Sequence, residues 1–327
     1  MADHLAGQPG VPVRPPAARR SVEDLRFVVV GAYVADCIVR TPRLPAWGEE
    51  YEARSIRTSP GGKALNQAVA LARLGAQVTA VGVVGDDGLG HDVLTALARE
   101  GIDASGVQLR ESVATTVCLC LVSDTGENSI VWHIDDAAAV TPGTVRDAAS
   151  ALERAGAVLI TFEAPVESIR EAICYASRGG ARVIVQPAPP LADPAAAASL
   201  PWEQVDVLVP NEAEARALLS QDRSEGLAAD LLAAELSAAL GVSTVVVTLG
   251  ASGCVAHVAG VSRPYPAHQI VAVDTTGAGD AFVATFAAQL AAGASEADAI
   301  HAGQAAAAAA VQRAGGYESM PASASLR

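Results

Sequence analysis

The sequence alternates between short apolar runs and longer amphipathic segments, and this alternation constrains the fold more than any other feature. The first run, Arg26–Gly31, is apolar after its arginine and ends in glycine, as buried strands of parallel sheets do. Glycines such as Gly75, Gly101 and Gly241 follow the amphipathic segments, where helices commonly stop. The pattern predicts a parallel sheet with helices on both faces. Further strands are expected at 78–84, 157–161, 182–185, 205–209 and 244–249, and helices at 63–74, 91–100, 166–177, 227–240, 278–290 and 296–310, with another from Glu212.

Two regions, Asp36–Thr58 and Ala114–Ile134, interrupt the alternation. They contain strand-like runs with no helix between them, such as Thr115–Val122 and Ser129–Ile134, which a turn over 124–128 joins. We expect a small accessory sheet, a lid over about 36–58 and 114–136, which could cover a site and exclude water. Residues 1–24 are expected to be a flexible tail, so that 25–327 would form the folded domain.

The charge balance excludes some classes of partner. The chain has 22 Lys+Arg and 36 Asp+Glu, a formal net charge of −14, and no basic run, which argues against nucleic acid or an anionic membrane as the main partner. The uncharged stretch 236–262 could be long enough to span a membrane, but four glycines interrupt it and two buried strands explain it better. The first 24 residues lack the apolar region of a signal peptide, so we expect a cytoplasmic protein.

The five cysteines are an odd, scattered set, which does not predict a disulfide framework. Cys118 and Cys120 alternate within a strand-like run, so both should face one side of a sheet. No second Cys or His pair lies at zinc spacing, so we expect small buried hydrophobic side chains here and no metal site.

The segment Val271–Phe282 carries the clearest indication of chemistry. A strand ends there, a glycine-flanked turn follows, and a helix begins. The amides of Gly277, Ala278 and Gly279 should be free at the helix N-terminus and point at an anion. Asp280 follows in the first helical turn, where a carboxylate can accept a proton from a hydroxyl that attacks phosphorus. A purely structural alternative is that Asp280 only complements the helix dipole.

A second segment, Pro60–Ala68, places two glycines before a helix. Lys63, Asn66 and Gln67 share one face of its first turns. The glycines allow a close approach to the backbone, and the polar face offers the directed hydrogen bonds that a polyol needs. The alternative is a solvated helix start. A P-loop is excluded, because Ala follows Lys63 and the required upstream glycine is missing.

These two segments resemble the two signatures of the PfkB (ribokinase-like) carbohydrate kinases. The first match reads Gly-Gly-Lys-Ala-Leu-Asn-Gln over 61–67 and the second Asp-Thr-Thr-Gly-Ala-Gly-Asp over 274–280, in the family's order. The resemblance covers roughly residues 26–321 and is closest to ribokinases. It implies a ribokinase-like three-layer α/β/α core with a mainly parallel sheet, plus the small β-sheet lid.

The resemblance also implies roles for the matching residues. Asp280 would be the general base, and Gly277, Ala278 and Gly279 would form the anion hole for the transferred phosphoryl group. The sugar would be held by Asp36, Gly62, Lys63, Asn66 and Glu163. ATP would contact Asn211, Thr248, Gly250 and Gly253, and Glu214 would reach Mg²⁺ through water. A monovalent-cation site, expected to take K⁺, would comprise Asp274, Thr276, Val311, Gly315 and Ser319.

Several of these residues have structural alternatives that the sequence leaves open. Asn211 and Glu214 fit a capping box at a helix start, a role that can coexist with phosphate binding. Asp36 could be a turn residue, Glu163 a solvated acid, and Gly250 and Gly253 a hairpin turn. Asp86 and Asp87 fit a helix cap better than a metal site. His133 is the one histidine that we place in the lid near a substrate.

The reaction that follows from the resemblance is transfer of the γ-phosphoryl group of ATP to a primary hydroxyl of a sugar, with D-ribose as the expected acceptor. Val34 stands where ribokinases usually have Asn, and 134–137 also departs from their pattern. A nucleoside or a specialised metabolite is therefore an alternative acceptor, and a non-catalytic regulator is the alternative from another class. Exposed strand edges in the lid are consistent with a homodimer.

Overall fold

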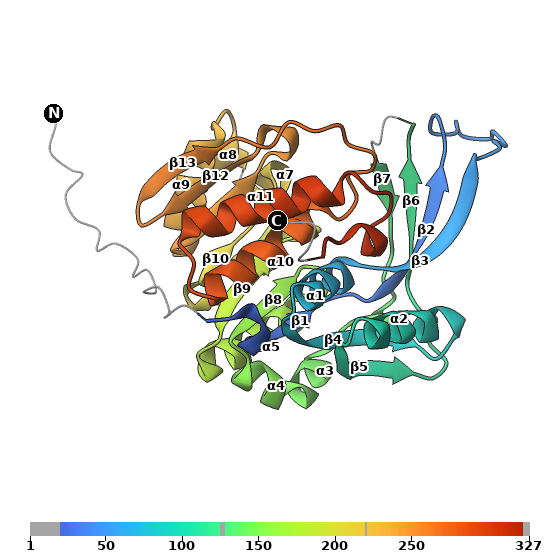
Figure 1. The fold of residues 1–327 in the computed structure, drawn as a ribbon, viewed down its shortest axis with the longest axis horizontal. Coiled ribbons are helices and arrows are strands. Elements are labelled where there is room, and N and C mark those ends of the chain that lie inside the picture. The colour runs from blue at the N-terminus through green and yellow to red at the C-terminus, as the bar shows by residue number, and fades with distance from the viewer. Residues whose placement is uncertain (1–19, 125–127, 220, 323–327) are drawn as a thin grey trace, which may run out of the picture.

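The computed structural model describes residues 20–124, 128–219 and 221–322, and a nine-stranded sheet forms its centre (Figure 1). The strand order is β13-β12-β11-β10-β9-β8-β1-β4-β5. Neighbours run parallel from β11 to β5, whereas β12 and β13 extend one edge antiparallel. The bounds are β1 Arg26–Val30, β4 Gln77–Gly85, β5 Asp103–Arg110, β8 Ala157–Thr161, β9 Arg182–Gln186, β10 Val207–Leu208, β11 Thr244–Thr248, β12 Cys254–Val258 and β13 Val261–Tyr265.

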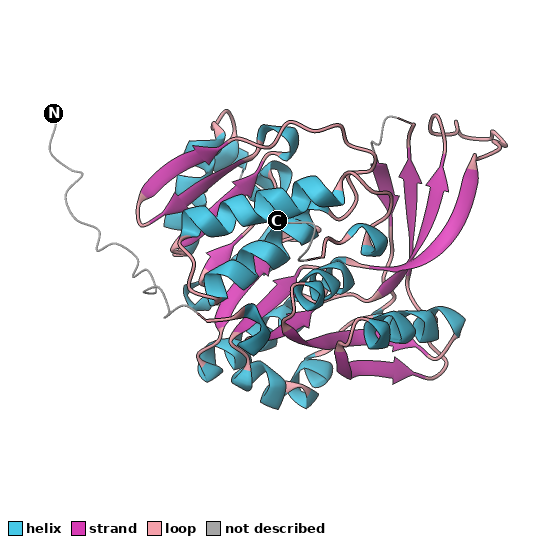
Figure 2. Ribbon diagram, viewed as in Figure 1, coloured by secondary structure: helices cyan, strands magenta, loops and turns pink. Residues whose placement is uncertain are grey.

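Helices cover both faces of this sheet (Figure 2). Because side chains alternate along a strand, Phe27 and Val29 of β1 pack into one apolar cluster, while Val28 and Val30 pack into the other. The first cluster includes residues of α1, α2, α10 and α11, and the second includes residues of α3, α4, α5, α7 and α9. The three-layer prediction is confirmed. The helices are α1 Lys63–Arg73, α2 Gly88–Arg99, α3 Pro142–Asp147, α4 Ala149–Arg154, α5 Val166–Gly179, α6 Pro194–Ala198, α7 Glu212–Leu218, α8 Gln221–Ser224, α9 Ala229–Leu240, α10 Ala278–Ala291 and α11 Glu296–Ala310.

A separate four-stranded sheet projects from the core and forms the lid (Figure 1). Its order is β3-β2-β6-β7, with bounds β2 Val34–Arg40, β3 Ser55–Gly61, β6 Val117–Val122 and β7 Asn128–Val131. The two predicted segments therefore form one small sheet, as expected. Of the turn predicted over 124–128, residues 125–127 lie outside the described residues.

Sequence reasoning missed some elements and misplaced the ends of others. Strands β5 and β13 and helices α3, α4, α6 and α8 were not predicted; neither strand has a fully buried residue or a continuous apolar run. Helix α2 starts before the expected His91, because Asp87 caps it by accepting from the Gly90 amide at 2.8 Å. Strand β10 is shorter than the expected 205–209, and Pro210 follows it.

The start of the described chain already packs on the core. The Arg20 amide donates to the Ala292 carbonyl oxygen at 3.0 Å, and Val22–Asp24 form a short 3₁₀ helix. Residues 1–19 of the predicted tail lie outside the described residues. Over the described ranges, no helix is both long and apolar enough to cross a membrane.

Candidate active site

The turn that precedes α10 exposes backbone amides beside a carboxylate. Gly277 is the N-cap residue with φ of 77°, in the left-handed region that favours glycine. The Ala278 amide donates to the Thr275 carbonyl oxygen at 3.3 Å, whereas no backbone acceptor for the Gly277 and Gly279 amides lies among the described residues. Two of the three predicted anion-hole amides can therefore face an anion directly, next to the buried Asp280.

Asp280 is held by amide side chains from two other elements. Its carboxylate accepts from Asn66 Nδ2 of α1 at 2.8 Å, and the side chain of Asp280 is only 5% exposed. Burial raises the pKa of Asp280, while Lys63 and the side-chain amides of Asn66, Gln67 and Gln186 oppose that rise. A carboxylate with a raised pKa is better suited to accept a proton from an alcohol than an ordinary aspartate.

The predicted sugar-binding turn lies opposite Asp280. Gly62 caps α1 with φ of 97°, and a Cβ atom there would lie 2.4 Å from the Ala32 carbonyl oxygen, so only glycine fits. The Lys63 amide donates to Glu163 Oε2 at 3.0 Å, and Lys63 Nζ lies 3.5 Å from Glu163 Oε1. Burial alone would lower the pKa of Lys63, but the carboxylates of Glu163 and Asp280 raise it overall.

These residues line a cavity of about 140 Å³ between the core and the lid. Asp36, Gly62, Lys63, Asn66, Glu163, Gly277 and Asp280 form its polar part. The lid contributes Asp36 to this polar part, and it also adds Cys118, Cys120, Asn128, Ile130, Trp132 and Ile134. The cavity thus combines charged groups with apolar side chains, which suits a small ligand that carries both hydroxyl groups and exposed carbon.

The two lid cysteines face the same side of the sheet, as the alternation predicted. Both line the cavity, and burial raises the pKa of Cys118 and of Cys120 to about 12. A thiol with a raised pKa is a poor nucleophile. Cys120 also packs in a small apolar cluster with Ile38 and Val122, and Cys118 packs against that cluster.

Asp36 has a strongly perturbed ionisation. It is 7% exposed, and burial, followed by the nearby Glu163 carboxylate, raises the pKa of Asp36 to about 7. The native state therefore binds this proton more tightly than the unfolded chain does between about pH 4 and pH 7. Across that window, Asp36 makes the free energy of unfolding fall as pH rises.

Asp36→Asn should remove this pH dependence of stability. We expect the mutant to lose less thermal stability than the wild type between pH 5 and pH 8, because a neutral amide has no proton to release. Thermal melts at each pH test this effect, with the exposed Asp92→Asn as control. Parallel melting curves for Asp36→Asn and the wild type would contradict the assignment.

A second cavity, of about 330 Å³, lies on the other side of the 275–280 turn. Thr248, Gly250 and Gly253 line it, as the nucleotide prediction requires, together with Ala278 and Gly279. Thr275 lines both cavities. Sequence reasoning missed most of the rest of the wall, which is formed by Ala251, 267–270, Ala272, Phe282, Gln304, Ala307 and Ala308. Val311, which the resemblance assigned to the cation site, also lines this cavity. The turn that carries the free amides and Asp280 therefore separates two cavities.

Asn211 and Glu214 form the capping box that the sequence left as an alternative. Asn211 Oδ1 accepts from the Glu214 amide at 2.8 Å, and Glu214 Oε2 accepts from the Asn211 amide at 2.8 Å. Burial raises the pKa of Glu214 to about 7. The hydrogen bond from the Asn211 amide and the charge of Lys63 oppose this rise, whereas the charge of Asp280 adds to it. Asn211 also forms an isolated parallel β-bridge with Thr248, which lines the second cavity. The pair is thus a cap that lies beside the predicted nucleotide site.

The described residues hold no group of three or more His, Cys, Asp and Glu that could bind a metal ion by themselves.

The predicted cation-site residues meet in one pair of loops. Asp274, 1% exposed, accepts from the Thr276 amide at 3.0 Å and from the Gly315 amide at 2.9 Å. The Asp274 amide donates to the Val311 carbonyl oxygen at 3.2 Å, and Ser319 Oγ donates to the Gly316 carbonyl oxygen at 2.9 Å. A buried carboxylate among carbonyl and hydroxyl oxygens is a donor set that suits a hard cation.

His133 corrects the sequence analysis. Its side chain is 82% exposed and lies 3.1 Å from Asp135, and it does not line the cavity. Its neighbours Trp132 and Ile134 do line it. Since side chains alternate on extended backbone, the inward direction of Trp132 and Ile134 places His133 outward.

Comparison with known proteins agrees with this site. The model of the pfkB family of carbohydrate kinases matches residues 24–323. A ribokinase of Haemophilus influenzae is 32% identical over 295 residues, which cover 90% of this chain and 95% of that protein. The crystal structure of a Thermotoga maritima ribokinase matches with a TM-score of 0.79 at 29% identity, covering 92% of this chain and 98% of that one. An Arabidopsis thaliana ribokinase complexed with ribose and ATP matches with a TM-score of 0.74 at 28% identity, covering 92% and 97%. The chain belongs to the pfkB family of carbohydrate kinases and is a phosphotransferase that acts on an alcohol group.

Proposed function

We propose that the protein is an ATP-dependent sugar kinase that transfers the γ-phosphoryl group of ATP to a primary hydroxyl of D-ribose, giving ribose 5-phosphate and ADP. One observation carries this proposal: the turn with the free Gly277 and Gly279 amides and Asp280 separates a polar cavity from a larger one. An acceptor and a nucleotide in these two cavities would meet at that turn. The relatives named ribokinase support ribose as the acceptor.

Asp280 would take the proton of the primary hydroxyl as its oxygen attacks the γ-phosphorus and the bond to the β-phosphate oxygen breaks. The Gly277 and Gly279 amides would stabilise charge on the phosphoryl oxygens, with Ala278 completing the turn. Asp36, Gly62, Lys63, Asn66 and Glu163 would orient the sugar. Closure of the lid would exclude water, which otherwise competes as acceptor.

Thr248, Gly250 and Gly253, which line the second cavity, would contact ATP. Asn211, which forms a β-bridge with Thr248, would also contact ATP, and Glu214 would help to hold a phosphate-bound Mg²⁺ that would neutralise developing charge. Asp274, Thr276, Val311, Gly315 and Ser319 would hold a monovalent cation, expected to be K⁺, beside the anion hole. ATP is abundant in the cytoplasm, where we place the enzyme.

The size of the acceptor cavity favours a monosaccharide over a nucleoside. Its volume of about 140 Å³ is less than half of the 330 Å³ of the second cavity. Val34, Ile130, Trp132 and Ile134 nevertheless give it an apolar wall, which would tolerate a deoxy sugar or the base of a nucleoside. These acceptors form the second candidate class.

The test is a screen for ADP release with ribose, 2-deoxyribose, fructose and adenosine, each with K⁺ or Na⁺ as the monovalent ion. We expect the highest kcat/KM with ribose, and higher activity with K⁺ than with Na⁺. A preference for adenosine would move the function to the second class. Absence of ADP release with every acceptor would overturn the kinase proposal and favour a regulator.

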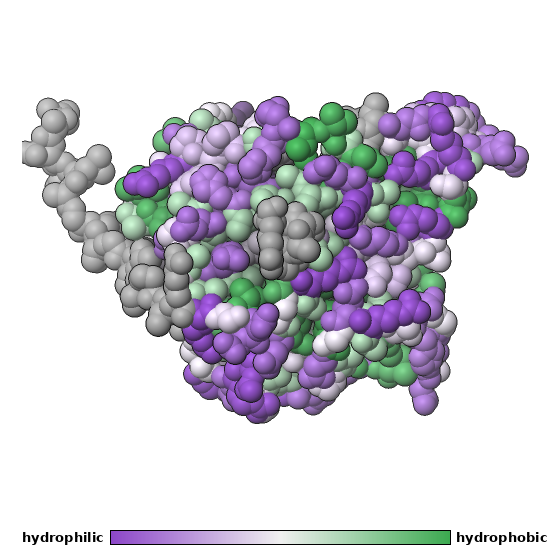
Figure 3. Space-filling model, viewed as in Figure 1, coloured by the Kyte–Doolittle hydropathy of each residue, from purple (hydrophilic) through white to green (hydrophobic). Residues whose placement is uncertain are grey.

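We also propose that two copies pair through their lids. On the lid face opposite the cavity, Ile56, Val117, Leu119 and Val131 are exposed, and Ile56 and Val131 are 67% and 60% exposed. Figure 3 shows hydrophobic residues at the surface on the lid side of the molecule. An exposed apolar face of this kind commonly marks an interface.

We expect a mass in solution near twice the 33.0 kDa of the chain, and a monomer for the double variant Ile56→Asp with Val131→Asp. Leu231→Asp, an equally drastic change at an exposed leucine of α9, should leave the dimer intact. Light scattering of all three proteins measures this, and a monomeric wild type would contradict the interface.

A further inference from the structure

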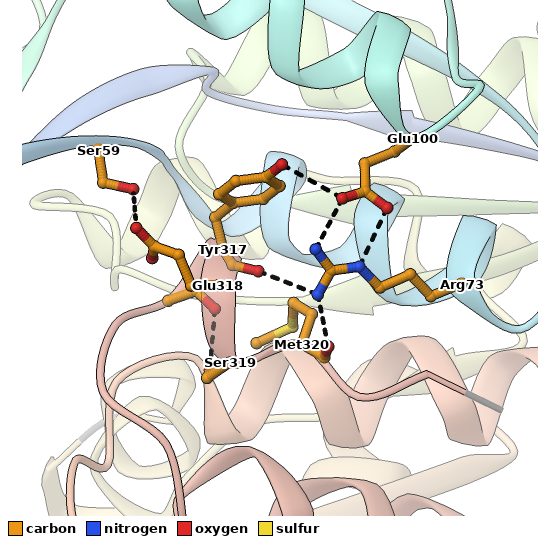
Figure 4. Close-up of polar contacts among 8 residues, drawn as sticks. Ser59, Arg73, Glu100, Tyr317, Glu318, Ser319 and Met320 are labelled. Atoms are coloured by element: carbon orange, nitrogen blue, oxygen red, sulfur yellow. Dashed lines mark hydrogen bonds and ion pairs between the residues drawn. The ribbon is translucent and has the colours of Figure 1, made fainter. Parts of the chain in front are cut away.

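The segment Gly315–Met320, which follows α11, contacts three separate parts of the molecule. It touches the last turn of α1 and the lid strand β3 (Figure 4). It also touches the turn that carries the anion hole, through Gly315 and Asp274. The segment includes the short 3₁₀ helix Tyr317–Ser319, and each of these contacts joins a side chain to a backbone or side-chain group of another element.

Arg73 anchors the segment to the core. Its Nη1 atom donates to the Met320 carbonyl oxygen at 2.6 Å and to that of Tyr317 at 3.4 Å. Its Nε and Nη2 atoms donate to the two oxygens of Glu100 at 3.0 and 2.6 Å, so the guanidinium group cannot rotate freely. Tyr317 Oη donates to the same carboxylate at 3.2 Å, and the Arg73 guanidinium lies 5.4 Å from the Tyr317 ring centre.

The anchored segment packs against the anion-hole turn. Met320 is fully buried, and its Cε atom lies 2.7 Å from the position that a Cβ atom on Gly277 would take. The Gly315 amide binds the Asp274 carboxylate at 2.9 Å, which in turn binds the Thr276 amide. A shift of the segment would therefore move the backbone on which the Gly277 and Gly279 amides depend.

The same segment also contacts the lid. Glu318 Oε1 accepts from Ser59 Oγ at 2.7 Å and from Arg57 Nη1 at 2.9 Å, both on β3. Ser59 is the register partner of Asp36 on β2, so this contact lies next to the sugar-binding strand. The segment thus connects the lid to the anion hole through a few side chains.

We propose that Arg73 is a positioning residue for phosphoryl transfer: with Glu100 it fixes the segment Gly315–Met320, and the segment fixes the anion hole relative to the lid. Arg73 lines neither cavity and touches no reacting group. The kinetic part of this inference rests on the proposed kinase function, whereas the structural coupling does not.

The test compares Arg73→Met and Glu100→Gln with Arg170→Met in the full-length protein. Arg170 is the matched control, because it also donates to a backbone carbonyl and a side chain, those of Ser199, outside both cavities. Amide hydrogen exchange over 274–281 is measured without ligands, and kcat and KM with ATP and ribose. Melting temperatures show whether each variant is folded.

We expect Arg73→Met to speed exchange over 274–281 and to lower kcat about 10–100-fold, with KM for the sugar nearly unchanged, because a small displacement of catalytic groups costs rate and not binding. Arg73→Lys should recover only part of the rate, since an ammonium group lacks the fork that holds Glu100 and the carbonyls together. If Arg73→Met does not fold, Glu100→Gln gives the same reading through a milder change.

The inference is overturned if folded Arg73→Met or Glu100→Gln lowers the melting temperature but matches Arg170→Met in exchange over 274–281 and in kcat. An inactive wild type that still shows faster exchange in Arg73→Met would overturn the proposed function and leave the coupling in place. An active wild type, together with unchanged exchange and kcat in Arg73→Met and Glu100→Gln, would overturn the coupling and leave the proposed function in place.

Discussion

Replacing Asp280 by Asn should lower kcat by about 10²–10⁴-fold, the usual contribution of a general base. The side chain keeps its size, and the new amide oxygen can still accept from Asn66 Nδ2, so ATP binding should survive. Because burial raises the pKa of Asp280, the neutral Asn should not destabilise the fold at pH 7 and above. ADP release, ATP titration and thermal melts measure the three effects.

Asp280→Glu is the matched variant, since it keeps the carboxylate but moves it by one methylene group. We expect activity between that of Asp280→Asn and the wild type. Near-normal turnover in Asp280→Asn would remove the assignment of the base, and loss of folding in both variants would make Asp280 a structural residue.

Gly277→Ala should lower kcat by about 10²–10³-fold, as loss of an oxyanion-type donor does in other enzymes. Two causes act together: φ of 77° disfavours any residue with a Cβ atom, and that atom would lie 2.7 Å from Met320 Cε. The turn must shift, and with it the amides that face the second cavity. The sugar-binding side chains stay in place, so KM for ribose should change much less than kcat.

Gly260→Ala is the control for backbone strain. Gly260 has φ of 80° with nothing within 4 Å of its would-be Cβ atom, and it lies outside both cavities. Both variants should lose stability, but only Gly277→Ala should lose rate. Equal kcat values for the two would contradict the anion-hole assignment.

The elements that could be predicted were those whose signals are local. Gly62 and Gly277 mark the starts of α1 and α10. Both adopt a positive φ that glycine tolerates better than other residues, so the residue type alone is a local signal. Continuous apolar runs predicted the central strands, because a strand that is covered on both faces has no position where a polar side chain could reach water. The half-exposed strand β5 offered no such run and was missed.

The site itself required more than local signals. Asn66 binds Asp280 across 214 positions of sequence, and spacing alone cannot show such a contact. The family resemblance assigned Asn66 to the sugar and Asp280 to the base, but it did not predict the bond between them. The wall formed by 267–270 lies in irregular chain without periodicity, so nothing in the sequence marked it. Alternation could have shown that Trp132 and Ile134, and not His133, point inward.

The acidic lining of the acceptor cavity bears on how turnover ends. Lys63 is paired with Glu163, and the lining also holds Asp280 and Asp36, whose negative charge develops as the pH rises past its pKa of about 7. A neutral pentose enters without electrostatic penalty, but it leaves carrying a phosphate of about −1.5 to −2 charges. Repulsion between this ester and the ionised carboxylates disfavours a lingering product, so a rise in pH through about 7 should speed the release of the phosphorylated sugar.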